Sequence, residues 1–219
     1  MLPNAWDAAS ARAVVAAGFP VVATTSAGVA EALGYKDHDG APAEEMLAAA
    51  ARVVRAVDVP VTIDLEAGYG LEPAELVAVL KEAGAAGCNL EDTDHSTETL
   101  RDVEEHAAWL LRLRDADPTL VINARIDVFL TGDGDVQDAL RRARAYLGAG
   151  ADCVYPIALA ERAVLARFVA EAGGAVNVLA NAGSVVELAA LGVARVSHGG
   201  LLYRETMAQF ARSLEALSG

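Results

Sequence analysis

Two carboxylates lie two residues apart in a stretch that is otherwise apolar or glycine-rich. Residues 63–70 read IDLEAGYG, which includes Asp64 and Glu66. Residues two apart in an extended chain point to the same side, so the two carboxylates should lie about 7 Å apart on one face. Their repulsion is relieved by a hard cation, and Mg²⁺ prefers oxygen ligands. We therefore predict a divalent metal site at Asp64 and Glu66; the alternative is a solvated loop after a strand.

Two further charged residues follow the next two apolar runs. Glu91 ends the run 87–91 (GCNLE), and Arg125 follows the run 120–124 (LVINA). Glu91 would share the cation, or it would form a salt bridge to a neighbouring strand. The planar guanidinium of Arg125 suits bidentate binding of a carboxylate or phosphonate. An ion pair of Arg125 with Glu91 or Asp127 is the alternative, and the two roles can coexist.

A stretch of small residues could hold the acidic end of a substrate. Thr25, Ser26, Ala27 and Gly28 offer hydroxyl and backbone N–H groups that suit an anion, although an ordinary turn fits equally well.

The remaining polar candidates are isolated. Asp37 lies in the loop 34–40 (GYKDHDG), which spacing alone does not distinguish from a solvated loop. His95, His106 and His198 have no partner at metal-ligand spacing, so we expect them to be structural or solvated.

The strands and helices of the fold must bring these residues together. Along the chain, short apolar runs alternate with amphipathic segments. Runs that are apolar throughout and rich in β-branched residues are typical of strands in a parallel sheet covered on both faces. The predicted strands are 21–25, 61–64, 87–91, 120–124, 152–155, 175–179 and 195–197, with a remnant of another at 1–4. The predicted helices are 6–17, 44–57, 73–83, 99–114, 136–147, 159–172, 185–191 and 201–217.

Regular strand–helix units favour one α/β domain over residues 1–219, a (β/α)8 TIM-type barrel. The alternative is an open doubly wound sheet, but no GxGxxG motif follows the first strand. Glycines between helices and strands suit left-handed helix ends. In a barrel the polar residues that end the strands meet at one mouth. Besides those named above, these are Asn4, Asp92, Asn181, Ser197 and His198.

Composition argues against several classes of protein. The formal net charge is −14 and basic residues form no block, so we expect no nucleic-acid partner. No apolar run reaches the roughly 18 residues that span a bilayer, and no leader-like segment opens the chain, so we expect no membrane association. Cys88 and Cys153 lie in apolar runs without metal-ligand spacing, which favours buried thiols and a cytoplasmic location.

At these residues the chain resembles the isocitrate lyase and phosphoenolpyruvate mutase superfamily. The similarity runs along nearly the whole chain and depends on the order and spacing of several segments. They are PNAWDAASA at 3–11, TTSAGVAEALGYKD at 24–37, PVTIDLEAGYG at 60–70, GCNLED at 87–92, NARIDVFL at 123–130, AYLGAGADCVYP at 145–156 and LGVARVSHGG at 191–200.

The resemblance implies a Mg²⁺-dependent barrel enzyme, for which Mn²⁺ could substitute, acting on a 2-oxo or 2-hydroxy acid or a phosphonate. It implies that Asp64 touches the metal and that Asp37, Glu66 and Glu91 mainly hold its waters. It assigns substrate binding to Arg125, to the segment 25–28 and to Asp64, with Arg125 and Glu91 as catalytic residues. It also implies a homo-oligomer, a dimer or tetramer in which the last helix packs on a neighbour.

The chain departs from that family in three places. After the fourth strand, lyase members carry a Lys-Lys-Cys-Gly-His-like loop with an acidic Cys, whereas residues 92–98 read DTDHSTE. The longer polar lid of phosphonomutase members is also missing there. Glu66 stands where many relatives have Asp, and the first strand is expected to be truncated.

These features leave three functional hypotheses. The first is a metal-dependent lyase or hydrolase that cleaves or rearranges a C–C or P–C bond beside an α-oxo or α-hydroxy carboxylate through an enolate-like state. The second is a metal-free barrel enzyme that binds phosphate at Gly183-Ser184 and Gly199-Gly200. The third is a non-catalytic ligand-binding or assembly protein, suggested by the missing loop.

Overall fold

Eight parallel strands form one sheet whose order follows the chain, β1-β2-β3-β4-β7-β8-β9-β10. The computed structural model describes residues 1–131 and 134–218. The Leu2 amide donates to the Val196 carbonyl over 2.7 Å, and Leu2 bridges Ser197 in parallel. The sheet is therefore nearly closed, which confirms the barrel and excludes the doubly wound alternative. The strands are β1 (Asn4–Ala5), β2 (Val22–Thr24), β3 (Val61–Asp64), β4 (Gly87–Glu91), β7 (Val121–Ile126), β8 (Cys153–Pro156), β9 (Ala175–Leu179) and β10 (Arg195–Ser197).

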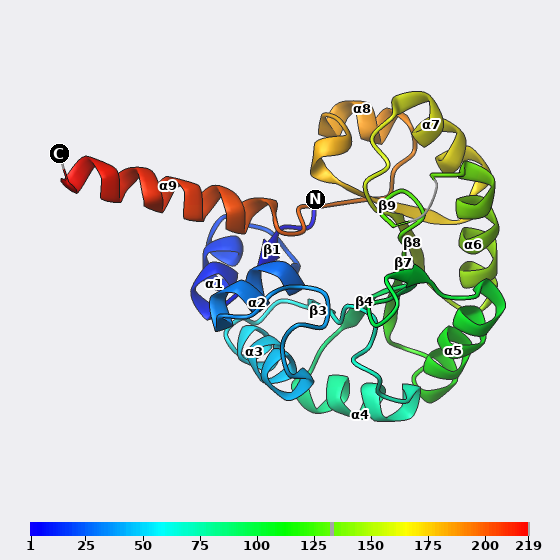
Figure 1. Cartoon of the computed structure of the whole chain (residues 1–219), viewed down its shortest axis with the longest axis horizontal. Coiled ribbons are helices and arrows are strands. Elements are labelled where there is room, and N and C mark those ends of the chain that lie inside the picture. The colour runs from blue at the N-terminus through cyan, green and yellow to red at the C-terminus, as the bar shows by residue number, and fades with distance from the viewer. Residues whose placement is uncertain (132–133, 219) are drawn as a thin grey trace.

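Helices surround the sheet, as Figure 1 shows in a view down the barrel, while α9 projects away from it. Their inner faces are apolar because residues three and four apart share one side of a helix. The helices are α1 (Ala8–Ala16), α2 (Ser26–Leu33), α3 (Ala43–Arg55), α4 (Pro73–Ala83), α5 (Val103–Ala116), α6 (Val136–Gly148), α7 (Arg162–Glu171), α8 (Val185–Ala190) and α9 (Leu201–Ser218), and a short 3-10 helix η1 spans Ala180–Ala182.

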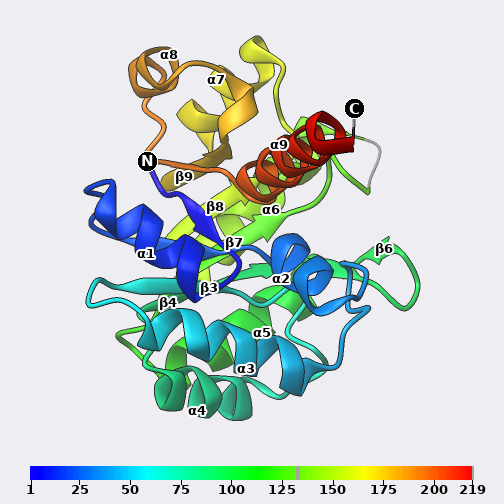
Figure 2. The ribbon, with the colours of Figure 1, turned by 90° about the vertical axis from the view of Figure 1, so that its left-hand side faces the viewer.

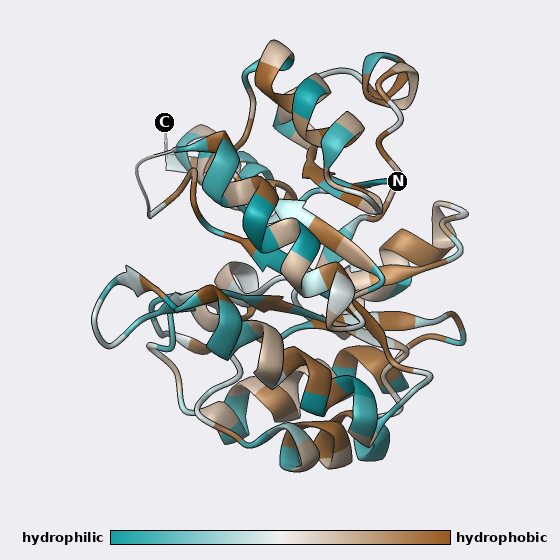
Figure 3. Cartoon of the chain, turned by 90° about the vertical axis from the view of Figure 1, so that its right-hand side faces the viewer, coloured by the Kyte–Doolittle hydropathy of each residue, from teal (hydrophilic) through white to brown (hydrophobic). Residues whose placement is uncertain are grey.

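The main hydrophobic core lies between the outer face of the sheet and these helices. Ile63, Leu90 and Ile122 from the strands are almost fully buried, as are Tyr146 and Phe168 from the helices. Hydrophobic and hydrophilic residues alternate around the outer helices in Figure 3, as expected for helices that bury one face. Because strand side chains alternate, the other face of each strand points into the barrel and is free to carry polar groups.

Glycine ends several helices where the chain turns back toward a strand. Gly84 caps α4 with φ 78°, and Gly18, Gly150, Gly173 and Gly192 also have positive φ. Glycine adopts this left-handed conformation without a Cβ penalty, which confirms the prediction made from the sequence.

Two local predictions differ from the structure. Residues 26–33 form helix α2, whereas only the segment 25–28 had been considered, as an anion-binding stretch or an ordinary turn. The helix predicted from residue 99 begins at Val103, because the Asp102 side chain accepts hydrogen bonds from Glu104 N and Glu105 N and so caps it. The residues before it form an antiparallel hairpin of β5 (Thr93–Asp94) and β6 (Thr99–Leu100), which projects from the barrel in Figure 2.

Two chemical features of the chain follow from the same fold. Cys88 and Cys153 are buried free thiols. Among the described residues, no helix is both long enough and apolar enough to cross a membrane.

Candidate active site

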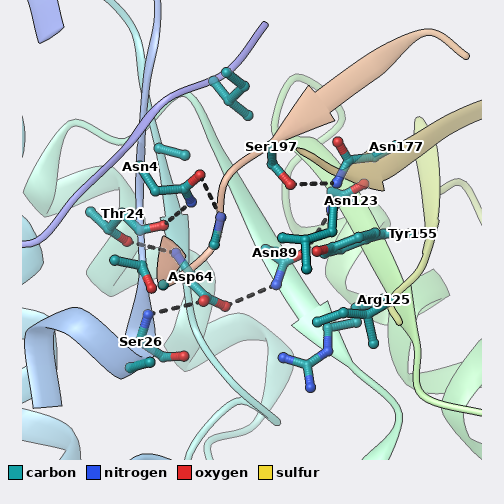
Figure 4. Close-up of a pocket in the computed structure, with 18 of the residues that line it drawn as sticks. Asn4, Thr24, Ser26, Asp64, Asn89, Asn123, Arg125, Tyr155, Asn177 and Ser197 are labelled. Atoms are coloured by element: carbon teal, nitrogen blue, oxygen red, sulfur yellow. Dashed lines mark hydrogen bonds between the residues drawn. The ribbon is translucent and has the colours of Figure 1, made fainter. Parts of the chain in front are cut away.

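A cavity of about 360 Å³ opens at the carboxyl ends of the strands. Asp64, Asp37 and Arg125 are among the residues that line it. Figure 4 shows side chains from several strands converging on this space. The expectation that strand-end residues meet at one mouth holds for most of them. Asn4, Thr24, Thr25, Ser26, Ala27, Asn181 and Ser197 also line the cavity.

Asp64 is held in place by a backbone donor at the start of α2 and a side-chain donor from β4. Its Oδ2 accepts from Ser26 N over 3.0 Å and its Oδ1 accepts from Asn89 Nδ2 over 2.8 Å. Its own amide donates to Thr24 Oγ1 over 2.8 Å. These bonds fix the carboxylate at the edge of the cavity before any ligand binds.

Asp37 comes from the loop after α2 and faces the same cavity as Asp64. Its Oδ1 is buried and has no hydrogen-bond partner within residues 1–131 and 134–218. A buried carboxylate oxygen without a partner is costly, and a cation supplies the missing interaction. The two carboxylates therefore fit a hard divalent cation such as Mg²⁺.

Glu66 does not lie beside Asp64 on an extended strand, as its spacing had indicated. Its φ is 50°, so the extended backbone has ended by this residue. The buried carboxylate accepts hydrogen bonds from Asp39 N and from the Tyr69 hydroxyl. Burial, together with the nearby charges of Asp37, Asp64 and Asp39, raises the pKa of Glu66 to about 7 although the Asp39 amide opposes this. Glu66 thus lies behind the cavity wall, next to the carboxylates that line it.

Glu91 is fully buried and lies between two cationic or ionisable partners. One carboxylate oxygen contacts His95 Nε2 and the other contacts Arg125 Nη1. Burial raises the pKa of Glu91, while Arg125 and His95 oppose that rise. The salt bridge to a neighbouring strand, which the sequence left open for this residue, is present, since β4 pairs with β7 at Glu91 and Arg125.

The Arg125 guanidinium is fixed by two carboxylates. Its Nε and Nη2 donate to the two oxygens of Asp127 over 2.6 and 3.0 Å, and its Nη1 faces Glu91. Burial alone would lower the pKa of Arg125, but Glu91 and Asp127 outweigh it and raise the pKa. Asp127 is itself held by the Thr93 hydroxyl, and its amide donates to Asp92. The guanidinium is therefore rigid and its position is set by two strands.

The segment 25–28 forms the first turn of α2. The first hydrogen bond within the helix runs from Val29 N to Thr25 O, so the preceding amides point out of the helix start. Ser26 N is used by Asp64, and the amides of Ala27 and Gly28 have no partner in the helix. Gly28 does not line the cavity, and a Cβ there would lie 2.8 Å from Thr25 Cγ2 and 3.1 Å from Trp6 Cβ. Glycine at this position lets α2 pack closely.

His95 has partners that its position in the sequence did not reveal. It lies in the β5–β6 hairpin, where its ring contacts Glu91 and packs edge-on against His38 at 5.1 Å. Two groups of possible metal ligands share it among the described residues. They are His38, Glu91 and His95, and Asp39, Glu66 and His95. Contact with Glu91 raises the pKa of His95. His106 is buried and does not line the cavity. His198 does not line it either, and its backbone amide donates to Asn4 Oδ1.

Sequence reasoning also missed polar residues inside the barrel. Asn89, Asn123, Asn177 and Arg195 line the cavity from inward-facing strand positions. Asn123 Nδ2 donates to Asn89 Oδ1 over 2.6 Å, which extends the hydrogen bonds that hold Asp64. Their signal was present in the sequence as isolated polar residues inside apolar strands.

In the two glycine-rich segments proposed for phosphate binding, donor groups already form hydrogen bonds within the protein. Ser184 N and Oγ donate to Glu187 Oε2, so a carboxylate fills the start of α8. Asn4 Oδ1 accepts from His198 N and Gly199 N. The structure therefore does not favour the metal-free phosphate enzyme.

The fold and this site define a class of parallel-barrel enzyme with acidic residues and a fixed arginine at the mouth. The chain belongs to the phosphoenolpyruvate phosphomutase family, which it matches over residues 1–218, within the isocitrate lyase and phosphoenolpyruvate mutase superfamily. Its relatives include proteins named 2-methylisocitrate lyase, oxaloacetate decarboxylase and carboxyvinyl-carboxyphosphonate phosphorylmutase.

Three similar proteins illustrate this family. A "putative phosphonomutase" of Burkholderia cenocepacia has 42% sequence identity and a TM-score of 0.92, over 98% of this chain and 92% of that one. An uncharacterized protein of Mycobacterium tuberculosis is 34% identical over 100% of this chain and 84% of its own length. A "probable 2-methylisocitrate lyase 1" of Corynebacterium glutamicum is 34% identical over 72% of this chain and 55% of its own length.

Proposed function

We propose that this chain is a Mg²⁺-dependent enzyme that cleaves or rearranges a C–C or P–C bond beside an α-oxo or α-hydroxy carboxylate. The observation that carries the proposal is that the carboxylates of Asp64 and Asp37 both line the cavity. One of them is anchored by two donors and the other has a buried oxygen without a partner. That arrangement suits a cation that binds a small acidic substrate.

Mg²⁺, or Mn²⁺ in its place, would be held by Asp64 and Asp37. When bound it would polarise the oxo group and stabilise negative charge that develops beside it. Glu66 and Glu91 are buried and do not line the cavity, and we propose that they orient metal-bound waters and set the local charge.

The chain's own groups bind and orient the substrate. The free amide of Ala27 at the start of α2 would donate to the substrate carboxylate. Arg125, clamped by Asp127 and Glu91, would present a fixed positive charge to an acidic group on the cavity side. Because these groups are fixed before binding, little ordering is needed when the substrate arrives.

The loop after β4 limits which reaction is plausible. The β5–β6 hairpin, from Thr93 to Leu100, carries neither Cys nor Lys. Cleavage that depends on a Cys acid in that loop therefore has no counterpart in this chain, and we do not assign isocitrate or methylisocitrate as the substrate. The proposal is restricted to the class of 2-oxo acids, 2-hydroxy acids and phosphonates.

A thermal-shift titration with oxalate, with and without Mg²⁺, tests the site. Oxalate resembles the enolate of pyruvate in shape and charge. We expect stabilisation that requires both Mg²⁺ and Asp64, of about 2.7 kcal/mol at an oxalate concentration 100 times the dissociation constant. Asp64→Asn and Asp64→Ala should abolish it. Asp58→Ala, which removes an exposed carboxylate, should leave it intact.

A turnover screen of 2-oxo acids, including oxaloacetate, then separates an enzyme from a binding protein. Turnover that is lost in Asp64→Asn supports the proposal. Mg²⁺-dependent binding with no turnover across the panel would favour the non-catalytic alternative, and oxalate binding that persists in Asp64→Asn would show that the metal site is elsewhere.

We also propose that the chain forms a homo-oligomer through α9. Among the described residues of this helix only Tyr203 is buried, while Phe210 and Leu214 are exposed. The test of this proposal is argued below with the whole molecule.

A further inference from the structure

A second cavity, of about 730 Å³, lies between the β5–β6 hairpin and helix α5 and is named the hairpin cavity below. The hairpin contributes Thr97 and Thr99 to its lining, Arg101 follows the hairpin, and α5 contributes His106 and Trp109. Among the described residues, the hairpin cavity and the cavity of the candidate active site have no lining residue in common. A molecule bound in the hairpin cavity would therefore occupy a separate site.

His106 brings to this cavity a buried polar side chain that lacks a partner. The residue is 2% exposed, and neither ring nitrogen forms a hydrogen bond with the residues that the structure describes. Burial, with the nearby charges of Arg101 and Arg142, lowers the pKa of His106 to about 3, so the ring is neutral near pH 7. A neutral imidazole carries one donor and one acceptor. Because buried polar groups are normally paired, these two nitrogens indicate a partner that is not part of the chain.

Arg101 carries an unpaired charge at the same cavity. Its backbone is fixed, because its amide donates to Asp92 O over 2.8 Å and its carbonyl accepts from Arg142 Nη1 over 2.9 Å. Its half-buried guanidinium, in contrast, forms no ion pair or hydrogen bond with residues 1–131 or 134–218. Arg112, which also lines the cavity, pairs with Glu72 at 3.6 Å. Arg101 is thus available to an anionic group, which a guanidinium can bind through two nitrogens.

The carboxylates around the hairpin cavity do not supply the missing partners. Asp94 accepts from Ser96 N and Ser96 Oγ over 2.9 and 2.6 Å, within the hairpin. Asp102 accepts from two backbone amides in the first turn of α5 and so caps that helix. Glu105, a third acid of the lining, is exposed to solvent. The two engaged acids serve local structure, so the unused donors of the cavity suit a ligand with a negative charge.

Trp109 gives the hairpin cavity a flat apolar wall. Its indole is half-buried and lies parallel to the His106 ring, with 6° between the planes and 6.1 Å between the centroids. Planar rings stack well on an indole. The donor and the acceptor of His106 match the edge of a nitrogen heterocycle, which carries both kinds of group. The wall therefore favours a planar ring over a simple ion.

We propose that the hairpin cavity binds a small molecule in which a planar nitrogen heterocycle carries an anionic group. Nucleoside monophosphates and heterocyclic carboxylates share this chemistry. The anionic group would pair with Arg101, while the ring would stack on Trp109 and form hydrogen bonds with His106. The cavity is within the size range of small-molecule sites, about 300–1,000 Å³. This inference goes beyond the proposed function and does not depend on it, since the two cavities are separate.

The fluorescence of Trp109 detects such a ligand directly. The chain has two tryptophans, so Trp6→Phe leaves Trp109 as the only indole and keeps an aromatic ring beside Tyr203. AMP would be compared with adenosine, and orotate with uracil, because each second compound keeps the ring and lacks the anionic group. Inorganic phosphate supplies the anion without the ring. We expect AMP or orotate to quench Trp109 saturably, with a dissociation constant at least ten times smaller than those of its neutral counterpart and of phosphate.

Substitutions then assign the binding to the hairpin cavity. Arg101→Met and His106→Leu should each raise the dissociation constant at least tenfold, and Arg101→Lys should raise it less than Arg101→Met. Arg141→Met removes an exposed arginine of α6 that does not line the cavity, and should leave the constant within a factor of two. Asp64→Asn should also leave it within a factor of two, because Asp64 lines the other cavity.

Hydrogen exchange locates the ligand without relying on His106→Leu, which removes a buried side chain and could fail to fold. A ligand between the hairpin and α5 should slow the exchange of the backbone amides of residues 97–101, and Arg101→Met should abolish this protection. No quenching by either AMP or orotate, or quenching that persists unchanged in Arg101→Met, would overturn the inference. Binding that is lost in Asp64→Asn would place the ligand in the candidate active site and would overturn it as well.

Discussion

His106 lies on the inner side of α5 with both imidazole nitrogens buried and without hydrogen-bond partners among the described residues. Its ring stacks on Trp109 and meets Tyr146 edge-on. Burial lowers the pKa of His106 to about 3, with Arg101 and Arg142 adding to the effect. The neutral ring is therefore the form that the folded protein tolerates.

This buried histidine makes the protein less stable at low pH. The unfolded chain takes up the proton below a pKa of about 6.5, whereas the folded chain resists it until about 3. Stability is thus unaffected above about 6.5 and falls as pH decreases toward the folded value. At pH 5.0 this one group should cost about 2 kcal/mol relative to pH 7.5.

The variant His106→Leu tests that effect. Leucine replaces two unpartnered polar atoms by apolar ones, so stability at pH 7.5 should be unchanged or slightly higher. Urea unfolding of both proteins at pH 7.5 and 5.0 should show that the variant loses about 2 kcal/mol less than the wild type on acidification. Equal losses in the two proteins would contradict the assignment.

At the scale of elements, α6 is joined to the carboxyl end of β4 by a buried polar network. Asp92 accepts hydrogen bonds from Arg142 Nη1 over 2.9 Å, from the Tyr146 hydroxyl over 2.7 Å and from Asp127 N over 2.9 Å. Through Asp127 the network reaches Arg125 in the candidate site. The helix thereby helps to fix the Arg125 guanidinium through Asp92 and Asp127.

Two adjacent arginines of α6 allow a controlled test. Arg142→Met leaves the buried Asp92 carboxylate without its charged partner, and we expect a loss of about 3–5 kcal/mol in the free energy of unfolding. Arg141→Met removes an exposed arginine that pairs with Asp138 and Glu104, and should cost about 0.5 kcal/mol or less. Denaturant unfolding of both variants measures the contrast, and similar losses would mean that the buried network contributes little.

The elements that the sequence predicted best are those with a strong local pattern. The strand over 61–64 and the helix over 73–83 match β3 and α4 in full, because an apolar run and an N-terminal proline mark them clearly. Helix α2 was missed, since it has only eight residues, contains Gly28 and is held largely by packing against distant parts of the chain. Such contacts leave no local pattern.

The candidate site, too, could be predicted from the sequence only in part. Asp64, Glu91 and Arg125 could be proposed from their positions at strand ends, because parallel strands end at one mouth. Asp37 was proposed only from the family resemblance. The partners of those residues could not be predicted. That the extended backbone ends before Glu66 and that His95 reaches Glu91 depend on backbone angles and on the folding of the hairpin over the barrel mouth.

At the scale of the whole molecule, helix α9 stands out because most of it does not pack against the barrel. It extends away from the ring of helices in Figure 1 and buries only Tyr203 among its described residues. Met207, Phe210, Leu214 and Leu217 are 44%, 56%, 49% and 83% exposed and lie three or four residues apart, which places them on one side. A helix of this kind gains most of its stability from packing, so an exposed apolar stripe indicates a missing partner.

A second copy of the chain fits this stripe. An apolar groove lies beside the N-terminal end of α9. It is lined by residues that include Trp6, Ala13, Phe19 and Leu202. Two copies could exchange their helices about a two-fold axis, each stripe covering the other's groove, which is the usual symmetry of homo-oligomers. We therefore expect the protein to be a dimer or a larger even-numbered assembly in solution.

Paired substitutions in α9 decide the question. Phe210→Asp places a carboxylate on the stripe, and Gln209→Asp places the same charge one residue away on an exposed polar position. Light scattering coupled to size-exclusion chromatography should show an oligomer for the wild type and for Gln209→Asp. Phe210→Asp should shift the population to monomer, with a dissociation constant at least ten times larger because a carboxylate would have to be buried in an apolar contact. A monomeric wild-type protein, or an oligomer that tolerates Phe210→Asp, would show that copies of this chain do not associate through the stripe.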